Sequence, residues 1–196
     1  MPNETNAPEV KGGSSRKSWS AVARRARVPL GFACALLYFW FARPTRASIL
    51  IGTLTLIPGL VVRALASGHV KKNEELATSG PYAYSRNPLY LGSLILAFGF
   101  MLAAQSWWVV AMLLTMFLAI YLPVIRGEEA FLRERFPGYQ AYAERVPRLL
   151  PTLRPFTDNH VKFSWDLYRQ HREYNALIGA AAMTAVLIAK MQWARR

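Results

Sequence analysis

The residues best suited to chemistry lie in two short polar segments that adjoin long apolar runs. The first segment, residues 80–90, is rich in turn-forming residues and contains Arg86 and three tyrosines. The second is Glu128-Glu129, at the end of a later apolar run. Ionisable side chains at a membrane edge are energetically costly and therefore usually mark a functional site. An arginine, tyrosines and two adjacent carboxylates at one edge of a helical hairpin can bind ligand groups of either charge.

The apolar residues are concentrated in five runs. Hydrophobic residues make up 53% of the 196-residue chain, and the mean hydropathy is positive, at +0.14. A bilayer core of about 30 Å requires roughly 17–25 helical residues, and fewer where flanking side chains reach the interface. We therefore predict an all-α integral membrane protein, a helical bundle with about five transmembrane helices, rather than a soluble helical protein with a very apolar core. The runs are Val28–Ala42, Ile49–Ala66, Leu89–Ala104, Trp107–Ile125 and Ala176–Ala189.

The length of the chain favours a single domain, which we place at residues 19–196. Residues 1–18 are rich in Pro, Asn, Glu, Gly and Ser without periodicity and are predicted to be a disordered tail. Trp19–Arg27 could form a short basic helix on the membrane surface. The third and fourth runs, separated only by Gln105-Ser106, are predicted to form a tight hairpin. The polar residues 171–174, ahead of the last run, are predicted to anchor it at the interface, with a second polar contact as the alternative.

The formal net charge of +13 is unevenly distributed along the chain. Lysines and arginines are concentrated before the first run and in residues 67–88 and 126–172, whereas the tip between the third and fourth runs carries none. The positive-inside tendency therefore predicts a multi-pass protein (of the inner membrane in a bacterium) whose polar site faces the cytoplasm. Arg43 and Arg46, in the first loop, depart from this pattern. We attribute the basic charge to attraction for membrane lipids and not for nucleic acid, because no nucleic-acid-reading motif accompanies it.

Cysteine and histidine give no sign of a metal site. Cys34 is the sole cysteine and lies in the first apolar run, which excludes a disulfide framework. The three histidines, His69, His160 and His171, have spacings that fit no common metal motif. We therefore predict no metal and expect each histidine to be an interfacial side chain.

Asn87-Pro88 is the predicted start of the helix that contains the third run. Proline is well tolerated in a first helical turn, and it pushes the preceding residue out of the helix, so Asn87 is the expected N-cap. Such a start leaves unpaired backbone N–H groups and the positive end of the helix dipole beside Arg86. A carboxylate or another anion would bind well there.

A longer pattern covers residues 69–151. Its first half reads Leu76-Ala77-Thr78-Ser79-Gly80-Pro81-Tyr82 and then Arg86-Asn87-Pro88-Leu89-Tyr90-Leu91-Gly92. Its second half consists of Glu128-Glu129, Leu132, Phe136, Gly138, Tyr139, Tyr142, Val146-Pro147 and Pro151. In order and spacing, the pattern resembles the signature of membrane-embedded methyltransferases, namely the isoprenylcysteine carboxyl methyltransferases and their phospholipid methyltransferase relatives.

The resemblance implies that the cofactor is S-adenosyl-L-methionine, held in a cytoplasmic pocket between the hairpin and the segment after it. It also implies catalytic roles for Glu128 and for Arg126, the nearest candidate for the arginine that orients the substrate. The chain has Asn87 and Glu74 at positions where the family often has histidine. The cofactor-binding residues that the resemblance implies are Glu75, Leu76, Ala77, Gly80, Tyr82, Arg86, Asn87, Pro88, Leu89, Tyr90, Glu128 and Glu129.

The side chains also suit the chemical groups of this cofactor. Glu128 or Glu129 can pair with its ammonium group or a ribose hydroxyl, and Arg86 can pair with its carboxylate. Tyr82 and Tyr90 offer aromatic faces to the adenine or the sulfonium. Methyl transfer is an in-line displacement, so it depends on alignment and electrostatics rather than on a nucleophilic side chain.

The implied acceptor is a lipophilic small molecule or a lipidated substrate that enters laterally from the bilayer. An isoprenylcysteine-like carboxylate is the leading candidate, because it needs no general base; a phospholipid amine is the alternative. From other classes, the chain could be a non-catalytic membrane scaffold or a membrane reductase of related topology. Each element taken alone also fits a turn, a solvated helix face or an aromatic belt, and their joint spacing is what favours a site.

Overall fold

The protein is helical throughout the part that the structure, a computed structural model, describes: residues 19–71, 74–157 and 161–194. These residues contain no β-strand, which confirms the predicted all-α class. The predicted disordered tail lies outside the described residues. In chain order the elements are α1 (Trp19–Phe41), α2 (Arg46–Ser67), the 3₁₀-helix η1 (Gly80–Ala83), α3 (Pro88–Ala104), α4 (Trp107–Met116), the π-helical turn η2 (Phe117–Tyr121), α5 (Leu122–Arg135), α6 (Tyr139–Arg145), α7 (Trp165–Gln170) and α8 (Tyr174–Trp193).

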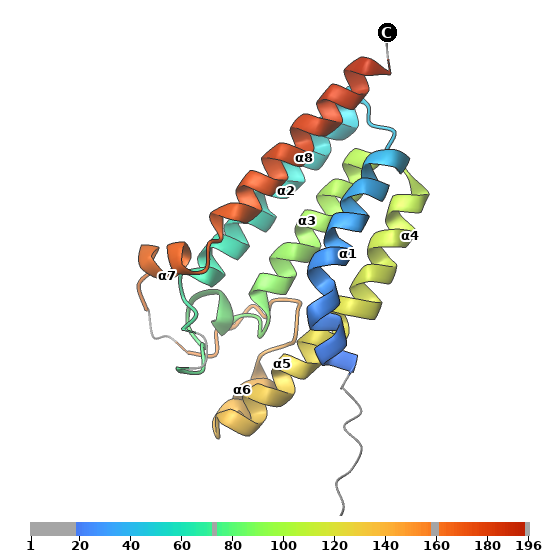
Figure 1. Cartoon of the computed structure of the whole chain (residues 1–196). Coiled ribbons are helices and arrows are strands. Elements are labelled where there is room, and N and C mark those ends of the chain that lie inside the picture. Colours follow the sequence, from blue (N-terminus) through green and yellow to red (C-terminus); the bar gives the residue numbers. More distant parts are fainter. Residues whose placement is uncertain (1–18, 72–73, 158–160, 195–196) are drawn as a thin grey trace, which may run out of the picture.

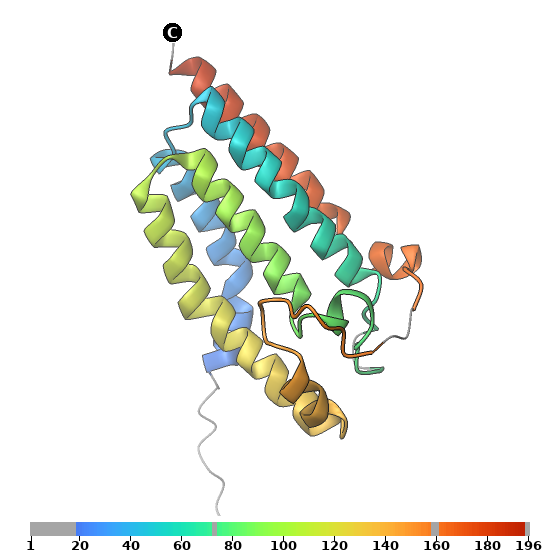
Figure 2. The same cartoon turned by 180° about the vertical axis from the view of Figure 1, so that it is seen from behind.

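The long helices lie side by side, and their connections gather at two ends (Figures 1 and 2). α8 runs along α2, α3 packs against the other side of α2, and α1 packs against α4 and α5. We call the end that holds residues 68–71, 74–87 and 136–157 the site end. The opposite end, which holds residues 42–45, residues 105–106 and the end of α8, is called the far end.

Four glycines allow α2 and α3 to approach closely. Gly52 and Gly59 on α2 are seven residues apart, as are Gly92 and Gly99 on the antiparallel α3, so the glycines meet in two pairs. A Cβ atom on Gly52 would lie 2.7 Å from the carbonyl oxygen of Gly99, and one on Gly92 would lie 2.8 Å from that of Gly59. Small residues drive close helix contacts of this kind where lipid surrounds the helices. The packing fixes where α3 begins, and therefore where the motif before it lies.

The predicted hairpin forms, with Gln105 in the left-handed conformation (φ 50°) between α3 and α4. Its second leg is one unbroken helical segment, Trp107–Arg135. The π-helical turn η2 ends at Tyr121, two residues before Pro123. Proline cannot donate the usual backbone hydrogen bond, and a π-turn is a common way for a helix to accommodate such a position. The turn sets the rotation of α5, which carries Glu128 and Glu129.

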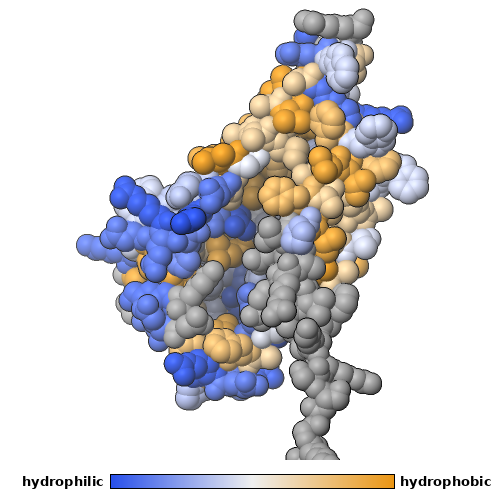
Figure 3. Space-filling view, viewed as in Figure 1, coloured by the Kyte–Doolittle hydropathy of each residue, from blue (hydrophilic) through white to orange (hydrophobic). Residues whose placement is uncertain are grey.

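Three helical segments are long and apolar enough to cross a membrane: Arg46–Ser67, Trp107–Arg135 and Tyr174–Trp193. The other two predicted runs lie in the shorter apolar helices Pro29–Phe41 and Pro88–Ala104. Hydrophobic side chains cover the sides of these helices, whereas hydrophilic side chains gather at the site end (Figure 3). This distribution matches the concentration of apolar residues that the sequence predicts.

The separate surface helix expected at Trp19–Arg27 is wrong. These residues are the first part of α1, which continues through Pro29 to Phe41 without a break. Residues 19–28 are mostly alanine and arginine, which favour helix, and no glycine separates them from the apolar run.

Candidate functional site

Gly80 fixes the turn that opens the site. Its backbone has a φ of 56°, in the left-handed region that favours glycine. A Cβ atom at this position would lie 2.6 Å from Cδ2 of His69, so a larger residue would also clash. The turn is followed by η1, in which Tyr82 is buried. Gly80 therefore brings η1 against His69, which lies two residues beyond the end of α2.

Asn87 and Pro88 start α3 as predicted, but the Asn87 side chain does not cap the helix. Its Nδ2 group instead donates to Oε1 of Glu129, at 2.9 Å, and to the carbonyl oxygen of Arg148, at 3.1 Å. Asn87 is therefore at the predicted N-cap position without capping the helix through its side chain. Its amide finds acceptors in the buried carboxylate and the carbonyl instead, and the first N–H groups of α3 have no side-chain cap. The Asn87 side chain joins α3, α5 and the segment after α6.

The segment that follows α6 lies alongside the motif residues 82–86. Its contacts are mainly backbone hydrogen bonds, which fix the position of both segments without depending on side-chain identity. Tyr142, on α6, adds a side-chain contact by donating from its hydroxyl to the carbonyl of Tyr82, at 2.7 Å. The backbone bonds run from Arg86 N to Pro147 O (3.0 Å), from Thr152 N to Tyr84 O (2.9 Å) and from Phe156 N to Ala83 O (2.9 Å).

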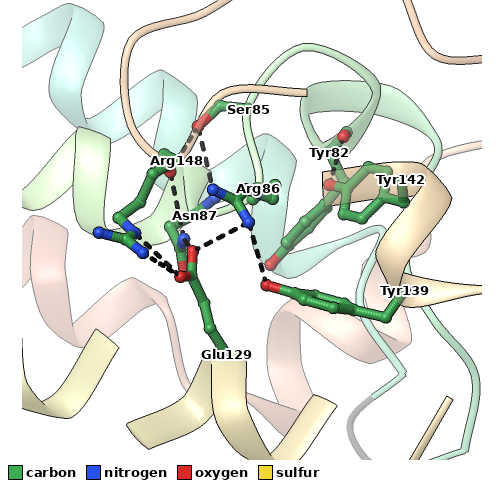
Figure 4. A network of polar contacts seen from close by, with 8 residues as sticks. All are labelled: Tyr82, Ser85, Arg86, Asn87, Glu129, Tyr139, Tyr142 and Arg148. Atoms are coloured by element: carbon green, nitrogen blue, oxygen red, sulfur yellow. Dashed lines mark hydrogen bonds and ion pairs between the residues drawn. The ribbon is translucent and has the colours of Figure 1, made fainter. Parts of the chain in front are cut away.

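Glu129 is buried and accepts several donors at the centre of this arrangement (Figure 4). Its Oε2 accepts from Nε of Arg148, at 2.9 Å, and lies 2.7 Å from Nη2 of the same guanidinium. Its Oε1 accepts from Asn87 and lies 3.8 Å from Nη1 of Arg86. We call Glu129, Asn87, Arg86 and Arg148 the Glu129 cluster. Because a buried carboxylate requires such partners, this cluster holds the motif turn, α5 and the segment after α6 together.

Arg86 has fewer partners than a buried guanidinium normally has. Its Nη1 donates to the Tyr139 hydroxyl at 3.4 Å, a long bond, and its ion pair with Glu129 is also long. Its Nε is buried without a hydrogen-bond partner among the described residues. A buried donor without an acceptor costs about 1–3 kcal/mol, so the arginine is well suited to accept an anionic ligand.

Glu128 has a different environment from its neighbour Glu129. It is partly exposed, and among the described residues its Oε1 accepts a single side-chain hydrogen bond, from the hydroxyl of Tyr90, at 3.0 Å. Successive residues of an α-helix are rotated by about 100°, so adjacent glutamates point in different directions. The two carboxylates of the predicted acidic pair therefore differ. Glu129 has donors on both oxygens, whereas Glu128 can accept further hydrogen bonds.

Arg126 does not lie on the face of α5 that carries Glu128. Two residues along an α-helix correspond to a rotation of about 200°, so Arg126 lies on the side of α5 opposite Glu128. Its side chain is exposed and joins none of the described contacts of the Glu129 cluster. The geometry gives no support to its predicted role in orienting the substrate.

The remaining predicted residues differ in what they contact. Glu75 is exposed and pairs with Lys71, at 3.2 Å. Leu76 packs against the buried tyrosines of α6, and Ala77 is half-buried beside it in the chain. The buried Tyr82 contributes its carbonyl to Tyr142, whereas the carbonyl of Leu89 accepts from Arg63.

A second ion pair, which the sequence does not predict, joins α2 to the start of α8. Arg63 donates from Nε and Nη2 to the two oxygens of Glu173, at 2.5 and 3.1 Å, and from Nη1 to Leu89 O and Ser93 Oγ. The absence of a side chain at Gly92 makes room for it, because a Cβ atom there would lie 2.4 Å from Cγ of Arg63. Residues 171–174 were predicted to anchor the last run, with a second polar contact as the alternative; the bidentate pair of Glu173, which we call the Arg63–Glu173 cluster, is such a contact.

The tyrosines around the site keep their protons. Burial raises the pKa of Tyr82 and Tyr142 well above the usual range, and nearby charges, including Glu128 for Tyr82, add to the effect. Burial also raises the pKa of Tyr139. Their hydroxyls are therefore hydrogen-bond donors at neutral pH, and they can position groups but cannot supply a base.

Taken together, the fold and the candidate site define a class of protein: an apolar helical bundle with a cluster of buried charged and polar side chains at one end. The profile of the phospholipid methyltransferase family matches residues 27–138, and the chain belongs to this family. The match confirms the resemblance that the motif carries. Membership indicates a membrane methyltransferase.

Two curated relatives are named for resistance to metals. The cobalt-zinc-cadmium resistance protein CzcN of Cupriavidus metallidurans is 33% identical over 164 residues, which are 78% of this chain and 76% of that protein. The nickel-cobalt-cadmium resistance protein NccN of Alcaligenes xylosoxydans is 36% identical over 86 residues, 44% of this chain and 40% of that protein. No solved structure matches the chain. Within the described residues, no group of three or more His, Cys, Asp or Glu side chains could hold a metal ion.

Two charged residues of the site region, Arg148 and Glu173, are not among the predicted site residues, and both lie beyond the residues that the family profile matches. A signal for Arg148 exists in hindsight: a buried Glu129 requires a cation, and Arg148 directly follows the Val146-Pro147 part of the motif. A signal for the second cluster also exists, because Arg63 interrupts an apolar run, and a charge in such a run requires a partner.

Proposed function

We propose that the protein transfers a methyl group from S-adenosyl-L-methionine to a lipophilic acceptor at the membrane. The single observation that carries the proposal is the presence, at the site end, of two charged side chains whose hydrogen-bonding capacity the described residues do not fill. Among the described residues, the buried Nε of Arg86 has no hydrogen-bond partner, and Glu128, the chain neighbour of the fully paired Glu129, accepts one side-chain hydrogen bond. A ligand with both a carboxylate and an ammonium group complements them.

The residues present fit this cofactor. Arg86, together with the uncapped N-terminus of α3, would receive the carboxylate. Glu128 would pair with the ammonium group or a ribose hydroxyl, and Tyr90, which is half-buried, offers an aromatic face. Glu129, predicted as a direct ligand, is better suited to hold Arg86 and Asn87 in position, because its oxygens already have donors. Glu75 and Arg126, both exposed, have the least support as ligands.

When bound, the cofactor supplies an activated methyl group on a sulfonium, and the C–S bond breaks as the bond to the acceptor forms. The protein's part is to align and to stabilise. Tyr90 orients Glu128 through its hydroxyl, and Arg86 fixes the opposite end of the ligand. Because the nearby tyrosines stay protonated and no histidine joins the Glu129 cluster in the described structure, an acceptor that is already deprotonated suits this site best.

The acceptor enters from the bilayer in this proposal, with all five apolar helices spanning the membrane and the site end in the cytoplasm. The apolar sides of the helices and the basic residues of the site end support this orientation. An isoprenylcysteine-like carboxylate remains the leading acceptor, and a phospholipid amine is the alternative. The names of the relatives suggest metal resistance as a context for the methylated product.

Radiolabelled methyl transfer tests the proposal directly. The purified full-length protein is incubated with methyl-labelled S-adenosyl-L-methionine and membranes of the source cell, and the label is followed separately into extracted lipids and into protein. We expect label in a lipid or lipidated product, whose mass then identifies the acceptor.

Label in neither fraction, although the folded protein binds the cofactor, would point to a missing acceptor. Label in neither fraction and no cofactor binding would favour the non-catalytic scaffold. A nicotinamide cofactor that binds in its place would favour the reductase.

A further inference from the structure

The far end of the molecule carries positive charge without any acidic residue to balance it. Every Asp and Glu of the chain lies in residues 1–18, 74–75 or 128–173, whereas Arg43, Arg46 and Lys190 lie at the far end. Positive charge at this end departs from the pattern by which basic residues mark the cytoplasmic side. Such charges require an explanation that the methyl-transfer site does not provide.

Two of these cations line one cavity. A pocket of about 490 Å³ lies between the α1–α2 connection and the last turns of α8. Arg43 and Lys190 are its charged lining residues, and Trp40 and Thr45 also line it. Two cations that share a cavity repel each other unless an anion lies between them.

The backbone holds the ammonium group of Lys190 and the loop that carries Arg43, whereas the described residues leave the Arg43 guanidinium free to bind a ligand. Lys190 Nζ donates to the carbonyl oxygens of Phe39 and Trp40, at the C-terminal end of α1, where the helix dipole favours a cation. An ammonium group has three donors, so one remains available for the pocket. The backbone N–H of Arg43 donates to Ala104 O, at 2.7 Å, which fixes the loop, while its side chain makes no hydrogen bond or ion pair among the described residues.

The tryptophans of this end indicate its depth in a bilayer. Tryptophan is enriched at the level of the lipid headgroups. Four tryptophans lie at the far end with side chains between 72% and 87% exposed: Trp40, Trp107, Trp108 and Trp193. The cavity therefore opens where lipid phosphates are most concentrated.

From these observations we propose that the Arg43–Lys190 cavity binds the phosphate of an anionic phospholipid. The phosphate lies between the two cations, with the acyl chains along the exposed apolar sides of α1 and α8. The bound lipid balances the charge of the far end and ties α1 to α8. The proposal is independent of the methyl-transfer site, because all its residues are at the opposite end.

Native mass spectrometry of the full-length protein, titrated with phosphatidylglycerol or phosphatidylcholine, tests the proposal. We expect phosphatidylglycerol to bind about tenfold more tightly than phosphatidylcholine, and Arg43→Gln to weaken it by about tenfold, as loss of one charge-assisted contact predicts. Arg46→Gln is the matched control: Arg46 is equally exposed and lies three residues further on, but outside the cavity. Its phosphatidylglycerol affinity should change less than about twofold.

Equal losses in Arg43→Gln and Arg46→Gln would overturn the proposal in favour of diffuse surface attraction, and so would equal affinity for the two lipids. Complete displacement of the lipid by inorganic phosphate would also overturn it, in favour of a soluble anion. Because Lys190→Gln removes the contact to the end of α1, it is measured together with the melting temperature. A variant that melts normally but keeps wild-type phosphatidylglycerol affinity contradicts the site.

Discussion

Glu128 and Glu129 are adjacent in the sequence, yet they belong to two regions of the site with opposite character. Glu129 has donors on both oxygens, from Asn87 and from the Arg148 guanidinium. Glu128 accepts one side-chain hydrogen bond, from Tyr90, and is open on its other side. The difference shows how two adjacent glutamates can have separate roles. Glu129, whose oxygens already have donors, holds the site together, and Glu128 remains available to bind a ligand.

The largest expected effect is a loss of protein stability, which we expect from mutation of Glu129 but not from mutation of Glu128. Glu129→Ala leaves Arg86 and the buried amide of Asn87 without their shared acceptor, and each buried donor that loses its acceptor costs about 1–3 kcal/mol. We expect a large fall in the melting temperature of the protein in detergent and loss of cofactor binding with it. Glu134→Ala, on an exposed position of the same helix, is the control and should melt like the wild type. A normal melting temperature for Glu129→Ala would show that the cluster does not hold the site.

Glu128→Gln should give the converse result. The fold keeps its melting temperature, because Gln still accepts from Tyr90, but a charge-assisted contact to the ligand is lost. Such contacts contribute about 1.5–3 kcal/mol, so the affinity for S-adenosylhomocysteine, the demethylated product, should fall by roughly 10- to 150-fold. Equilibrium binding, with Glu134→Gln as the matched control, measures it. An unchanged affinity would remove Glu128 from the ligand site.

The Arg63–Glu173 cluster extends the comparison to a second ion pair. Its arginine already donates to Glu173, Leu89 O and Ser93, so it resembles Glu129 in being saturated. We expect Glu173→Gln to reduce the free energy of unfolding by about 1–3 kcal/mol while the intrinsic affinity for S-adenosylhomocysteine changes less than about threefold. Melting curves and binding assays on the same preparation measure both quantities. A large loss of affinity without a loss of stability would instead assign this cluster to the ligand.

The smallest effect concerns the residue that orients Glu128. Tyr90→Phe removes the hydroxyl that orients the Glu128 carboxylate but leaves the charge of that carboxylate in place, so the affinity for S-adenosylhomocysteine should fall by roughly 2- to 12-fold, or about 0.5–1.5 kcal/mol. The melting temperature should change little. Tyr84→Phe, which alters an exposed hydroxyl close in the chain, is the matched control for the binding assay. If both variants bind equally well, Tyr90 does not orient the carboxylate.

Much of the fold could be predicted because it follows from hydrophobic periodicity and turn chemistry. The apolar runs became helices, Gln105-Ser106 became the tip of the hairpin, and Pro88 became the first residue of α3. These features depend on local sequence alone. The surface helix at residues 19–27 failed because the sequence gives a helix start but cannot say whether the helix stops before Pro29.

The site was harder to predict, because partner choice depends on helix rotation and on long-range packing. The sequence indicated that residues 86–90 and Glu128-Glu129 belong together, and the hydrogen bonds from Asn87 and Tyr90 join them. It could not distinguish the two glutamates, since the distinction comes from about 100° of rotation on α5. It also did not identify Arg148, because this residue lies in the segment after α6, which has no regular structure and whose position the sequence does not predict.

The proposed function requires that the site end binds S-adenosyl-L-methionine through Arg86 and Glu128. Isothermal titration of the folded wild-type protein with S-adenosylhomocysteine tests this binding most directly, because the product binds without requiring an acceptor. We expect saturable binding with one molecule per chain. A well-folded protein that gives no saturable heat, at product concentrations up to the millimolar range, would contradict it.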